Sequence, residues 1–198
     1  MDWSALFDTI SKIIEEIDTF FPYKVIRVPH AEGDDVIAVL SKAFNEKSLI
    51  VSSDKDFSQL YKYKWVKQYS PMKQKMLNGI DPYKYLKEHI IRGDKGDGIP
   101  NILSDDDCIV NGVRQKAISK KKIANWLVED PHDFPDDMKR GWIRNKILID
   151  FDLIPEKISN AILDQYNEEK KYQNGQLMNY FIKNRLKYLM ENMGDFTR

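Results

Sequence analysis

The spacing of hydrophobic residues predicts two helices in the first quarter of the chain. Between residues 4 and 21 such residues recur every three or four positions, which is the period of an amphipathic helix, and Ser4 is a suitable N-cap. Pro22 ends this pattern because proline interrupts a helix. Residues 32–46 show the same period, so we expect a second helix there with its apolar positions turned inward.

Three short segments predict the strands of a sheet. KVIRV (24–28) predicts a short strand, and SLIVS (48–52) is the continuous apolar run of a buried parallel strand. KWVKQYS (64–70) alternates between apolar and polar residues and predicts a strand nearer an edge. With a short helix at 56–62, the order strand, helix, strand, helix, strand favours an α/β fold with a parallel sheet.

The pattern changes near residue 80, after which only helices and irregular segments are predicted. Asp81 and Pro82 open a helix that ends at residue 92. Further helices are predicted at 119–129, 139–149, 155–170 and 176–192. We therefore expect a sheet-containing domain at residues 1–80 and a helical region at residues 81–198.

The composition excludes some classes of protein and leaves others open. Lys and Arg total 31 and Asp and Glu total 31, so the zero net charge neither supports nor excludes a nucleic-acid partner. The single cysteine, Cys108, excludes an internal disulfide framework and suits a reducing compartment. No apolar run approaches about 18 residues, and the first residues lack a signal-peptide pattern. We therefore expect no membrane span and a cytoplasmic location, in a host cell if a phage encodes the chain.

Carboxylates gather where the predicted regular elements meet. Asp54 and Asp56 follow the strand at 48–52. A second group follows the strand at 24–28 and consists of Glu32, Asp34 and Asp35. Because ligands of parallel sheets collect beyond the carboxyl ends of the strands, we expect both groups at the same edge.

A cluster of carboxylates stays ionised in a small site only when a cation neutralises it. Hard oxygen donors select Mg²⁺ or Mn²⁺, and two such ions about 3.5–4 Å apart suit phosphodiester hydrolysis. Acidic residues also favour helix N-termini because they cap the helix and complement its dipole. The positions alone therefore leave open a purely structural role, or a nucleotide-binding α/β domain.

A glycine-rich stretch and a basic segment follow the helix at 81–92. GDKGDGIPNI (93–102) combines turn-forming glycines with Asp94 and Asp97, and taken alone it is most simply a loop. Residues 110–125 contain no acid and carry Arg114, Lys116, Lys120, Lys121 and Lys122. Ser119 can cap a helix whose first turn holds three lysines, and a helix start of this kind can bind phosphate. A nucleic-acid backbone site and a solvated lysine face both remain open.

Three motifs together resemble those of a known family. EGDDVIAVL (32–40), SSDKDFSQL (52–60) and GDKGDGIPNI (93–102), in this order and spacing, resemble the conserved core of the flap endonuclease/5′-nuclease family, most closely its phage ribonuclease H branch. The resemblance covers nearly all of the chain. It implies a partial PIN-like parallel sheet followed by a helical half with a helix–turn–helix DNA-binding module at about residues 93–125. It also implies a metal-dependent nuclease that removes RNA primers or flaps from 5′ ends during replication, with DNA and RNA/DNA hybrids as partners.

The resemblance implies roles for the acids. The first of two Mg²⁺ ions, which Mn²⁺ can replace, would be surrounded by Glu32, Asp34 and Asp54. The second ion would be served, partly through water, by Asp56, Asp94 and Asp97, and Asp35 lies beside them. The residues expected to be catalytic are Asp34, Asp54, Asp56 and Asp97.

The resemblance also implies a grip on the duplex backbone. The residues expected to make it are Gly98, Arg114, Lys116, Lys120, Lys121 and Lys122. The short glycine hairpin of most family members is replaced here by a longer segment that carries Asp105, Asp106 and Asp107. Three acidic side chains in this position are unfavourable for the binding of a phosphate, because like charges repel.

The largest departure from the family lies at the front of the chain. Family members begin with two acid-bearing strands and a basic arch, and this sequence starts after them. The two strands would lie between those at 24–28 and 48–52. We therefore expect the carboxyl-terminal piece of a split or truncated nuclease, completed by a separate N-terminal fragment. The alternatives are a structure-specific DNA-binding module without catalysis, or a subunit that docks a replication protein such as single-strand-binding protein or a sliding clamp.

Overall fold

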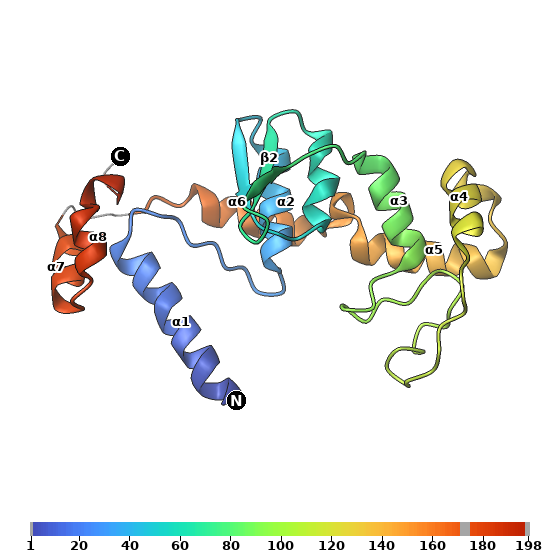
Figure 1. Cartoon of the computed structure of the whole chain (residues 1–198), viewed down its shortest axis with the longest axis horizontal. Helices are drawn as coiled ribbons and strands as arrows, with labels where there is room; N and C mark the ends of the chain where they lie inside the picture. The colour runs from blue at the N-terminus through green and yellow to red at the C-terminus, as the bar shows by residue number, and fades with distance from the viewer. Residues whose placement is uncertain (1, 171–174, 197–198) are drawn as a thin grey trace. The chain divides into compact units, whose positions relative to one another are not determined.

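The computed structural model describes residues 2–170 and 175–196 as helices and a small sheet (Figure 1). The α-helices are α1 (Trp3–Phe20), α2 (Gly33–Ala43), α3 (Pro82–Arg92), α4 (Lys120–Val128), α5 (Asp136–Ile149), α6 (Glu156–Asn167), α7 (Gln176–Lys183) and α8 (Lys187–Glu191). The strands are β1 (Ser48–Val51), β2 (Val66–Ser70) and β3 (Lys75–Leu77). Short 3₁₀ helices are η1 (Asp56–Lys62), η2 (Pro131–Asp133), η3 (Phe151–Leu153) and η4 (Met193–Phe196). This mixed architecture confirms the predicted α/β class.

Contacts divide the chain into two compact units. One contains the described residues of 1–29 and 162–198, and the other contains residues 30–161. The second unit holds the sheet and every residue that the sequence predicted to bind metal or DNA. The division at residue 80 that the sequence suggested stays a prediction.

The sheet has the order β1-β2-β3 and mixes two kinds of pairing. β1 runs parallel to β2 with Ser48 opposite Val66, and β2 runs antiparallel to β3 with Ser70 opposite Lys75. The prediction that 64–70 lies nearer an edge was wrong, because the unpredicted β3 pairs with its second side. The parallel pair β1–β2 ends beside η1, where Asp56 begins the 3₁₀ helix.

The strand predicted at 24–28 is absent, and this segment has no regular structure. Its polar groups bond to the end of α6 and the residues after it instead. The Arg27 N–H donates to Gln165 Oε1 at 2.9 Å, and the Lys24 ammonium donates to the carbonyl oxygens of Tyr166 and Glu168. A strand needs a neighbour to pair its backbone, and no described residue supplies one here.

Separate apolar clusters form the core of the second unit. One packs α2 and η1 on the sheet and contains Ala38, Ile50, Phe57, Leu60 and Val66. Another packs α3, α4 and α5 together and contains Ile91, Ile102, Ile123, Phe134 and Met138. Ile102, the last residue of the glycine-rich stretch after α3, belongs to the second of these clusters and anchors that end of the loop.

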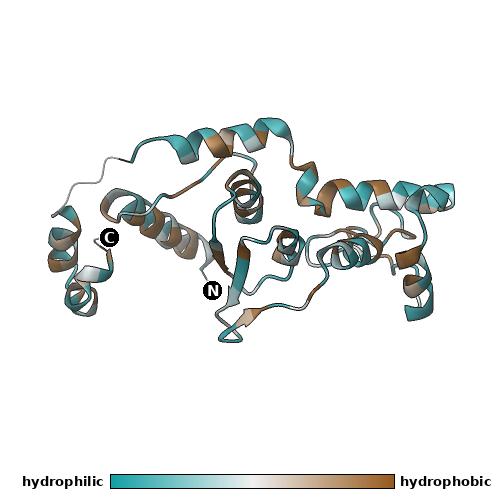
Figure 2. Cartoon of the chain, turned by 90° about the horizontal axis from the view of Figure 1, so that it is seen from above, coloured by the Kyte–Doolittle hydropathy of each residue, from teal (hydrophilic) through white to brown (hydrophobic). Residues whose placement is uncertain are grey.

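The other unit departs from the sequence predictions at its helix ends. Asp2, and not Ser4, caps α1, because its carboxylate accepts the Ala5 N–H at 3.1 Å. The single helix predicted at 176–192 is two helices, α7 and α8, since Arg185 adopts a left-handed φ of 56° between them. Hydrophobic and hydrophilic residues alternate along α1 (Figure 2), and its Trp3 and Phe7 are each 61% exposed. None of the helices in the described ranges has the length and apolar character needed to cross a bilayer.

Candidate metal centre and nucleic-acid interface

Six of the predicted acids line one cavity of about 530 Å³, which we call the acidic cavity. They are Glu32, Asp34, Asp35, Asp56, Asp94 and Asp97. They come from the start of α2, from η1 and from the loop after α3. Residues between 147 and 155, from the end of α5 to the residue before α6, complete the lining of the cavity. The sequence therefore placed these acids correctly near one another, although one of the two strands that was to bring them there is absent.

The start of α2 positions its three acids through backbone hydrogen bonds. The Glu32 N–H donates to Asp35 Oδ2 at 3.0 Å, and the Asp35 N–H donates to Asp34 Oδ1 at 3.0 Å. Burial and the charges of Asp35 and Glu32 raise the pKa of Asp34, more than its hydrogen bonds from the backbone lower it. The hydrogen bonds from the backbone therefore do not fully compensate the burial of Asp34 and the repulsion among the carboxylates at this end of the cavity.

The two acids after β1 have different surroundings: Asp54 takes part in a turn, and Asp56 lines the acidic cavity. Asp54 Oδ1 accepts the Asp56 N–H at 2.9 Å, and the Asp54 N–H donates to Ser52 Oγ at 3.1 Å. Asp54 is not among the residues that line the acidic cavity, whereas Asp56 is. Asp54 is still close enough for its charge to contribute to the raised pKa of Asp97.

Asp56 is held by two residues of α3 that the sequence analysis had not assigned, Tyr85 and His89. The Tyr85 hydroxyl donates to Asp56 Oδ1 at 2.8 Å. His89 Nδ1 lies 3.2 Å from the same oxygen, in a direction poorly aligned for a hydrogen bond, and its Nε2 lies 3.2 Å from Asp94 Oδ2. The only sequence signal was the spacing of four residues between Tyr85 and His89, which puts both on one face of the helix.

This contact shifts two pKa values in opposite directions. Burial disfavours the imidazolium form, but the close contacts with the charged Asp56 and Asp94 carboxylates outweigh it and raise the pKa of His89. Burial likewise disfavours the Asp56 carboxylate, but His89 and Tyr85 outweigh it and lower the pKa of Asp56. When His89 is protonated, its imidazolium partly neutralises the two carboxylates that it contacts.

The loop after α3 folds tightly around Asp94. Its Oδ1 accepts the Gly96 N–H at 2.7 Å, and its carbonyl accepts the Ile99 N–H at 2.6 Å. Gly93 has a φ of 66°, and a Cβ there would lie 2.4 Å from the Ile99 carbonyl oxygen, so only glycine fits. The loop therefore presents Asp94 and Asp97 to the cavity because glycine permits its close turn.

Three residues form a group with the spacing of metal ligands. Asp56, His89 and Asp94 each offer one ligand atom, and these atoms lie within 4.8 Å of one another. Two carboxylates and an imidazole, with further carboxylates at the same cavity, are donors that divalent cations such as Mg²⁺ and Mn²⁺ accept.

A second cavity, of about 620 Å³, has basic walls, and we call it the basic hollow. Its cationic residues are Arg92, Lys95, Arg114 and Lys116. Arg114 and Lys116 were predicted from the sequence, and Arg92 and Lys95 were not. Residues 113–118, which form much of the wall, have no regular structure.

The other predicted DNA-binding residues lie outside the basic hollow. Gly98 lines the acidic cavity, with a φ of 75°. Lys120, Lys121 and Lys122 form the exposed first turn of α4. Ser119 caps this helix as predicted, because its hydroxyl accepts the Lys122 N–H at 3.3 Å. One loop joins the two cavities, since Asp94 and Asp97 line the acidic one and Lys95 lines the basic one.

Comparison with known protein families shows where this chain belongs. The family model described as T4 RNase H, C terminal, matches residues 83–196, and that described as 5'-3' exonuclease, N-terminal resolvase-like domain, matches residues 4–89. The chain is a member of the 5′-nuclease family. The predicted resemblance is therefore confirmed, and with it the phage ribonuclease H branch.

Individual relatives agree with this assignment. Ribonuclease H of Enterobacteria phage T4 is 34% identical over 208 residues, which cover 98% of this chain and 68% of the relative. A 5'-3' exonuclease of Aquifex aeolicus (strain VF5) is 26% identical over 156 residues, which cover 71% of this chain and 54% of that protein. Both relatives of this 5′-nuclease family member are longer than the part that matches it.

A solved structure confirms the fold. The T5 D15 protein, co-crystallised with metal ions, matches with a TM-score of 0.50 and 19% sequence identity, covering 80% of this chain and 68% of that one. At 19% identity this structural similarity supports the fold of the chain and nothing more specific. The roles of its individual acids and lysines stay predictions.

Proposed function

We propose that this chain is the carboxyl-terminal part of a metal-dependent 5′-nuclease. The enzyme would hydrolyse phosphodiester bonds at the 5′ ends of RNA primers or flaps on DNA. The observation that carries the proposal is the acidic cavity, where six carboxylates from three separate segments come together beside a basic hollow. A basic surface that holds a phosphate backbone next to clustered carboxylates is the arrangement that metal-assisted hydrolysis needs. The family to which the chain belongs supports the same reaction.

The residues of the acidic cavity fit divalent cations. Burial and the charges of Asp94, Asp56 and Asp54 raise the pKa of Asp97, as those of Glu32 and Asp35 raise that of Asp34. Bound cations would relieve this repulsion. One ion would be held by Asp56 and Asp94 with His89 beside them or as a ligand, and a second by Glu32 and Asp34 with Asp54 near it. Such ions supply an activated water and stabilise the leaving oxygen.

The chain's own residues would orient the reacting groups. Tyr85 fixes Asp56 by its 2.8 Å hydrogen bond, and Asp94 is fixed by the Gly96 N–H at 2.7 Å. Arg114 and Lys116, with the lysines at the start of α4, would hold backbone phosphates without reading the bases. The oxygen-rich donor set favours Mg²⁺, and a His89 ligand would also suit Mn²⁺.

We further propose that a separate N-terminal nuclease fragment completes the enzyme along β1. Among the described residues, β1 pairs with β2 alone, so its other edge is open. Leu49 and Val51 on this strand are 56% and 64% exposed. An open edge with exposed apolar residues is a surface that natural proteins normally cover. Replication proteins such as single-strand-binding protein or a clamp, in the cytoplasm of a host cell, are the further partners we expect.

A cleavage assay tests the proposal. DNA with a 5′ flap and a 5′-labelled RNA/DNA hybrid are incubated with the purified chain in Mg²⁺, in Mn²⁺ and in EDTA, with and without the N-terminal third of a 5′-nuclease relative added as a separate polypeptide. We expect cleavage near the 5′ end that needs the divalent ion and increases with the added fragment.

Two outcomes would contradict parts of this proposal. Binding of the flap without cleavage under every condition would favour the alternative of a non-catalytic DNA-binding module. Full cleavage by the chain alone, with no change on addition of the fragment, would contradict the complementation along β1 and leave the nuclease assignment standing.

A further inference from the structure

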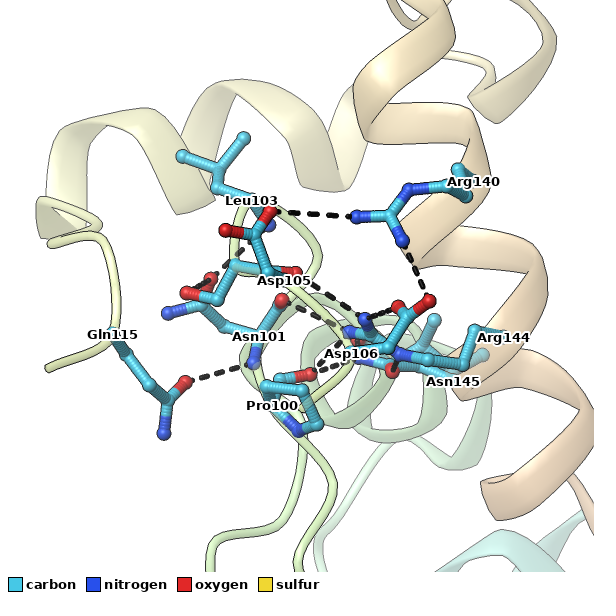
Figure 3. Close-up of polar contacts among 11 residues, drawn as sticks. Pro100, Asn101, Leu103, Asp105, Asp106, Gln115, Arg140, Arg144 and Asn145 are labelled. Carbon is cyan, nitrogen blue, oxygen red and sulfur yellow. Dashed lines mark hydrogen bonds and ion pairs between the residues drawn. The ribbon is translucent and has the colours of Figure 1, made fainter. Parts of the chain in front are cut away.

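Two arginines of α5 hold an acidic turn inside the candidate DNA-binding region (Figure 3). Arg140 Nη1 donates to Asp106 Oδ2 at 2.6 Å, and its Nη2 lies 3.8 Å from Asp105 Oδ1. Arg144, one helical turn further, donates to the other oxygen of Asp106. Two of the three acids that seemed unfavourable for phosphate are therefore paired with cations.

Arg144 also binds the backbone of the turn at residues 100–104. Its Nη2 donates to the carbonyl oxygens of Pro100 at 2.8 Å and Asn101 at 3.1 Å, and its Nη1 donates to that of Ser104 at 3.2 Å. The Arg144 side chain is only 16% exposed. One partly buried side chain thus binds three carbonyl groups that lie outside helices and strands, which fixes the path of this turn.

The turn at residues 100–104 in turn binds the basic segment around residues 115 and 116 (Figure 3). The Asn101 N–H donates to Gln115 Oε1 at 2.8 Å, and the Asn101 side chain donates to the Lys116 carbonyl at 2.9 Å. The Lys116 N–H donates to Ser104 Oγ at 2.9 Å. The wall of the basic hollow has no helix or strand of its own around Lys116, so its position depends on these bonds.

The same assembly reaches the acidic cavity. Asn145, next to Arg144, donates from its side-chain amide to the carbonyls of Ile90 and Pro100, both at 2.8 Å. Ile99, the residue before Pro100, donates to the carbonyl of Asp94. Arg144 and Asn145 therefore bind the segment that separates the acids of one cavity from the cations of the other.

We infer that Arg144 is a positioning residue for nucleic-acid binding: it fixes residues 100–104 and neutralises Asp106, so that the basic segment faces the phosphate backbone. The inference rests on the proposed function, because it concerns the same surface. The hydrogen bond from Arg144 also lowers the pKa of Asp106, which favours the ionised form that pairs with the arginines. Without the arginine, an unpaired carboxylate would face the phosphates and repel them.

A double-mutant cycle tests the inference. The affinity for a labelled 5′-flap DNA is measured in EDTA, so that no cleavage occurs, for Arg144→Met, Asp106→Asn and the double variant. We expect Arg144→Met to weaken binding about tenfold, and Asp106→Asn to change it by less than about twofold. Adding Asp106→Asn to Arg144→Met should restore about threefold, because it removes the unpaired charge. Arg185→Met, which removes a cation from the other compact unit, is the charge-matched control and should change affinity by less than about twofold.

Thermal unfolding of each variant separates positioning from a loss of fold. A purely structural role would lower the melting temperature of Arg144→Met without rescue of binding by Asp106→Asn, and this result would overturn the inference. If Arg144→Met does not fold, Arg140→Met carries the test, since Arg140 pairs with Asp105 and Asp106 and, unlike Arg144, has no hydrogen bond to the backbone of the turn at residues 100–104. It should weaken binding about threefold, and an Asp106→Asn background should remove most of that effect. An unchanged affinity in Arg140→Met would then overturn the inference.

The result for the unmodified chain separates this inference from the proposed function. Absence of flap binding by the wild-type chain would contradict the proposed function and the inference together. Binding by the wild-type chain and equal binding by the arginine variants would contradict the inference alone.

Discussion

The acidic cavity and the basic hollow share one loop but are built in opposite ways. The acidic cavity takes its side chains from α2, η1, α3 and the loop after it, and side-chain contacts such as Tyr85–Asp56 hold them. The basic hollow takes much of its wall from one continuous irregular segment, which is held through its backbone by Asn101 and Ser104. The first is therefore a product of the tertiary fold, and the second depends on a single anchored turn.

The two cavities also differ in how their charges are balanced. Among the described residues that line the acidic cavity, only two histidines, His30 and His89, can carry a positive charge against its acids, whereas Asp105 and Asp106 near the basic segment are paired with Arg140 and Arg144. The structure thus leaves one surplus of negative charge and one of positive charge side by side. We therefore expect the acidic cavity to bind a cation and the adjoining basic hollow to bind a phosphate backbone. Each kind of binding can be tested separately.

The largest effect is expected from removing a ligand of the acidic cavity. Asp94→Asn should lower Mg²⁺-dependent cleavage about a thousandfold, since metal ions contribute several kcal/mol to such reactions, and should leave flap binding within about threefold. Cleavage rates and binding in EDTA are measured on the same substrate. Asp136→Asn, an exposed carboxylate on α5, is the matched control. Normal cleavage by Asp94→Asn would separate the acidic cavity from catalysis.

The next effect concerns the glycine loop that joins the cavities. Gly93→Ala should destabilise the fold by about 2–4 kcal/mol, because the new Cβ would meet the Ile99 carbonyl at 2.4 Å and φ is 66°. Gly79→Ala, with a φ of 77° but no atom within 4 Å of its Cβ, isolates the effect of backbone conformation, which is about 1–2 kcal/mol. Chemical denaturation measures both. Equal losses for the two variants would show that the close packing of the loop adds nothing.

A smaller effect is expected from single cations of the basic surface. Arg114→Gln and Lys121→Gln should each weaken flap binding and reduce the slope of log K against log salt by about 0.9 per lost phosphate contact. Arg114 lines the hollow and Lys121 lies on the exposed turn beside it, so we expect the larger loss for Arg114. Lys157→Gln, exposed on α6, is the control. Unchanged salt slopes in both variants would place the nucleic acid elsewhere.

The smallest effect is a pH dependence of stability that arises at His89. Because the fold raises the pKa of His89 above its ordinary value of 6.5, the imidazolium stabilises the metal-free protein. This contribution is complete below about pH 6.5 and is lost as the pH rises through the raised pKa. The lowered pKa of Asp56 acts in the opposite sense, and its contribution is lost only as the pH falls below about 3.8.

Thermal unfolding in EDTA from pH 5.5 to 8.5 measures this contribution of His89. The gap in melting temperature between the wild type and His89→Asn should be largest at the acidic end and narrow toward pH 8.5. A gap that stays constant with pH would mean that His89 contributes by packing and not by charge.

The sequence predicted the features that depend on local signals. The apolar run at 48–52 did form a strand that pairs in parallel with β2, although of its four residues only Ile50 is buried. Ser119 did cap α4, since a cap requires only neighbours along the chain. The segment at 24–28 failed as a strand because strand formation needs a paired neighbour, which no local pattern guarantees.

The features that depend on distant contacts could not be predicted in this way. His89 gains its place from Asp56, far away in the chain, and a lone histidine on a helix gives no sign of that. Asp105 and Asp106 looked unfavourable for phosphate because their partners, Arg140 and Arg144, follow more than thirty residues later. In both cases the charge of a residue was evident, and the charge that compensates it was not.

The central claim is that the acids of the acidic cavity hold divalent cations. Crystals of the chain grown or soaked with millimolar Mn²⁺ test it most directly by anomalous diffraction at the manganese edge. We predict an anomalous peak in the acidic cavity with carboxylate oxygens of Asp56 and Asp94 at about 2.0–2.4 Å, lost in Asp94→Asn. Well-ordered crystals with Mn²⁺ peaks only elsewhere on the molecule would contradict the account.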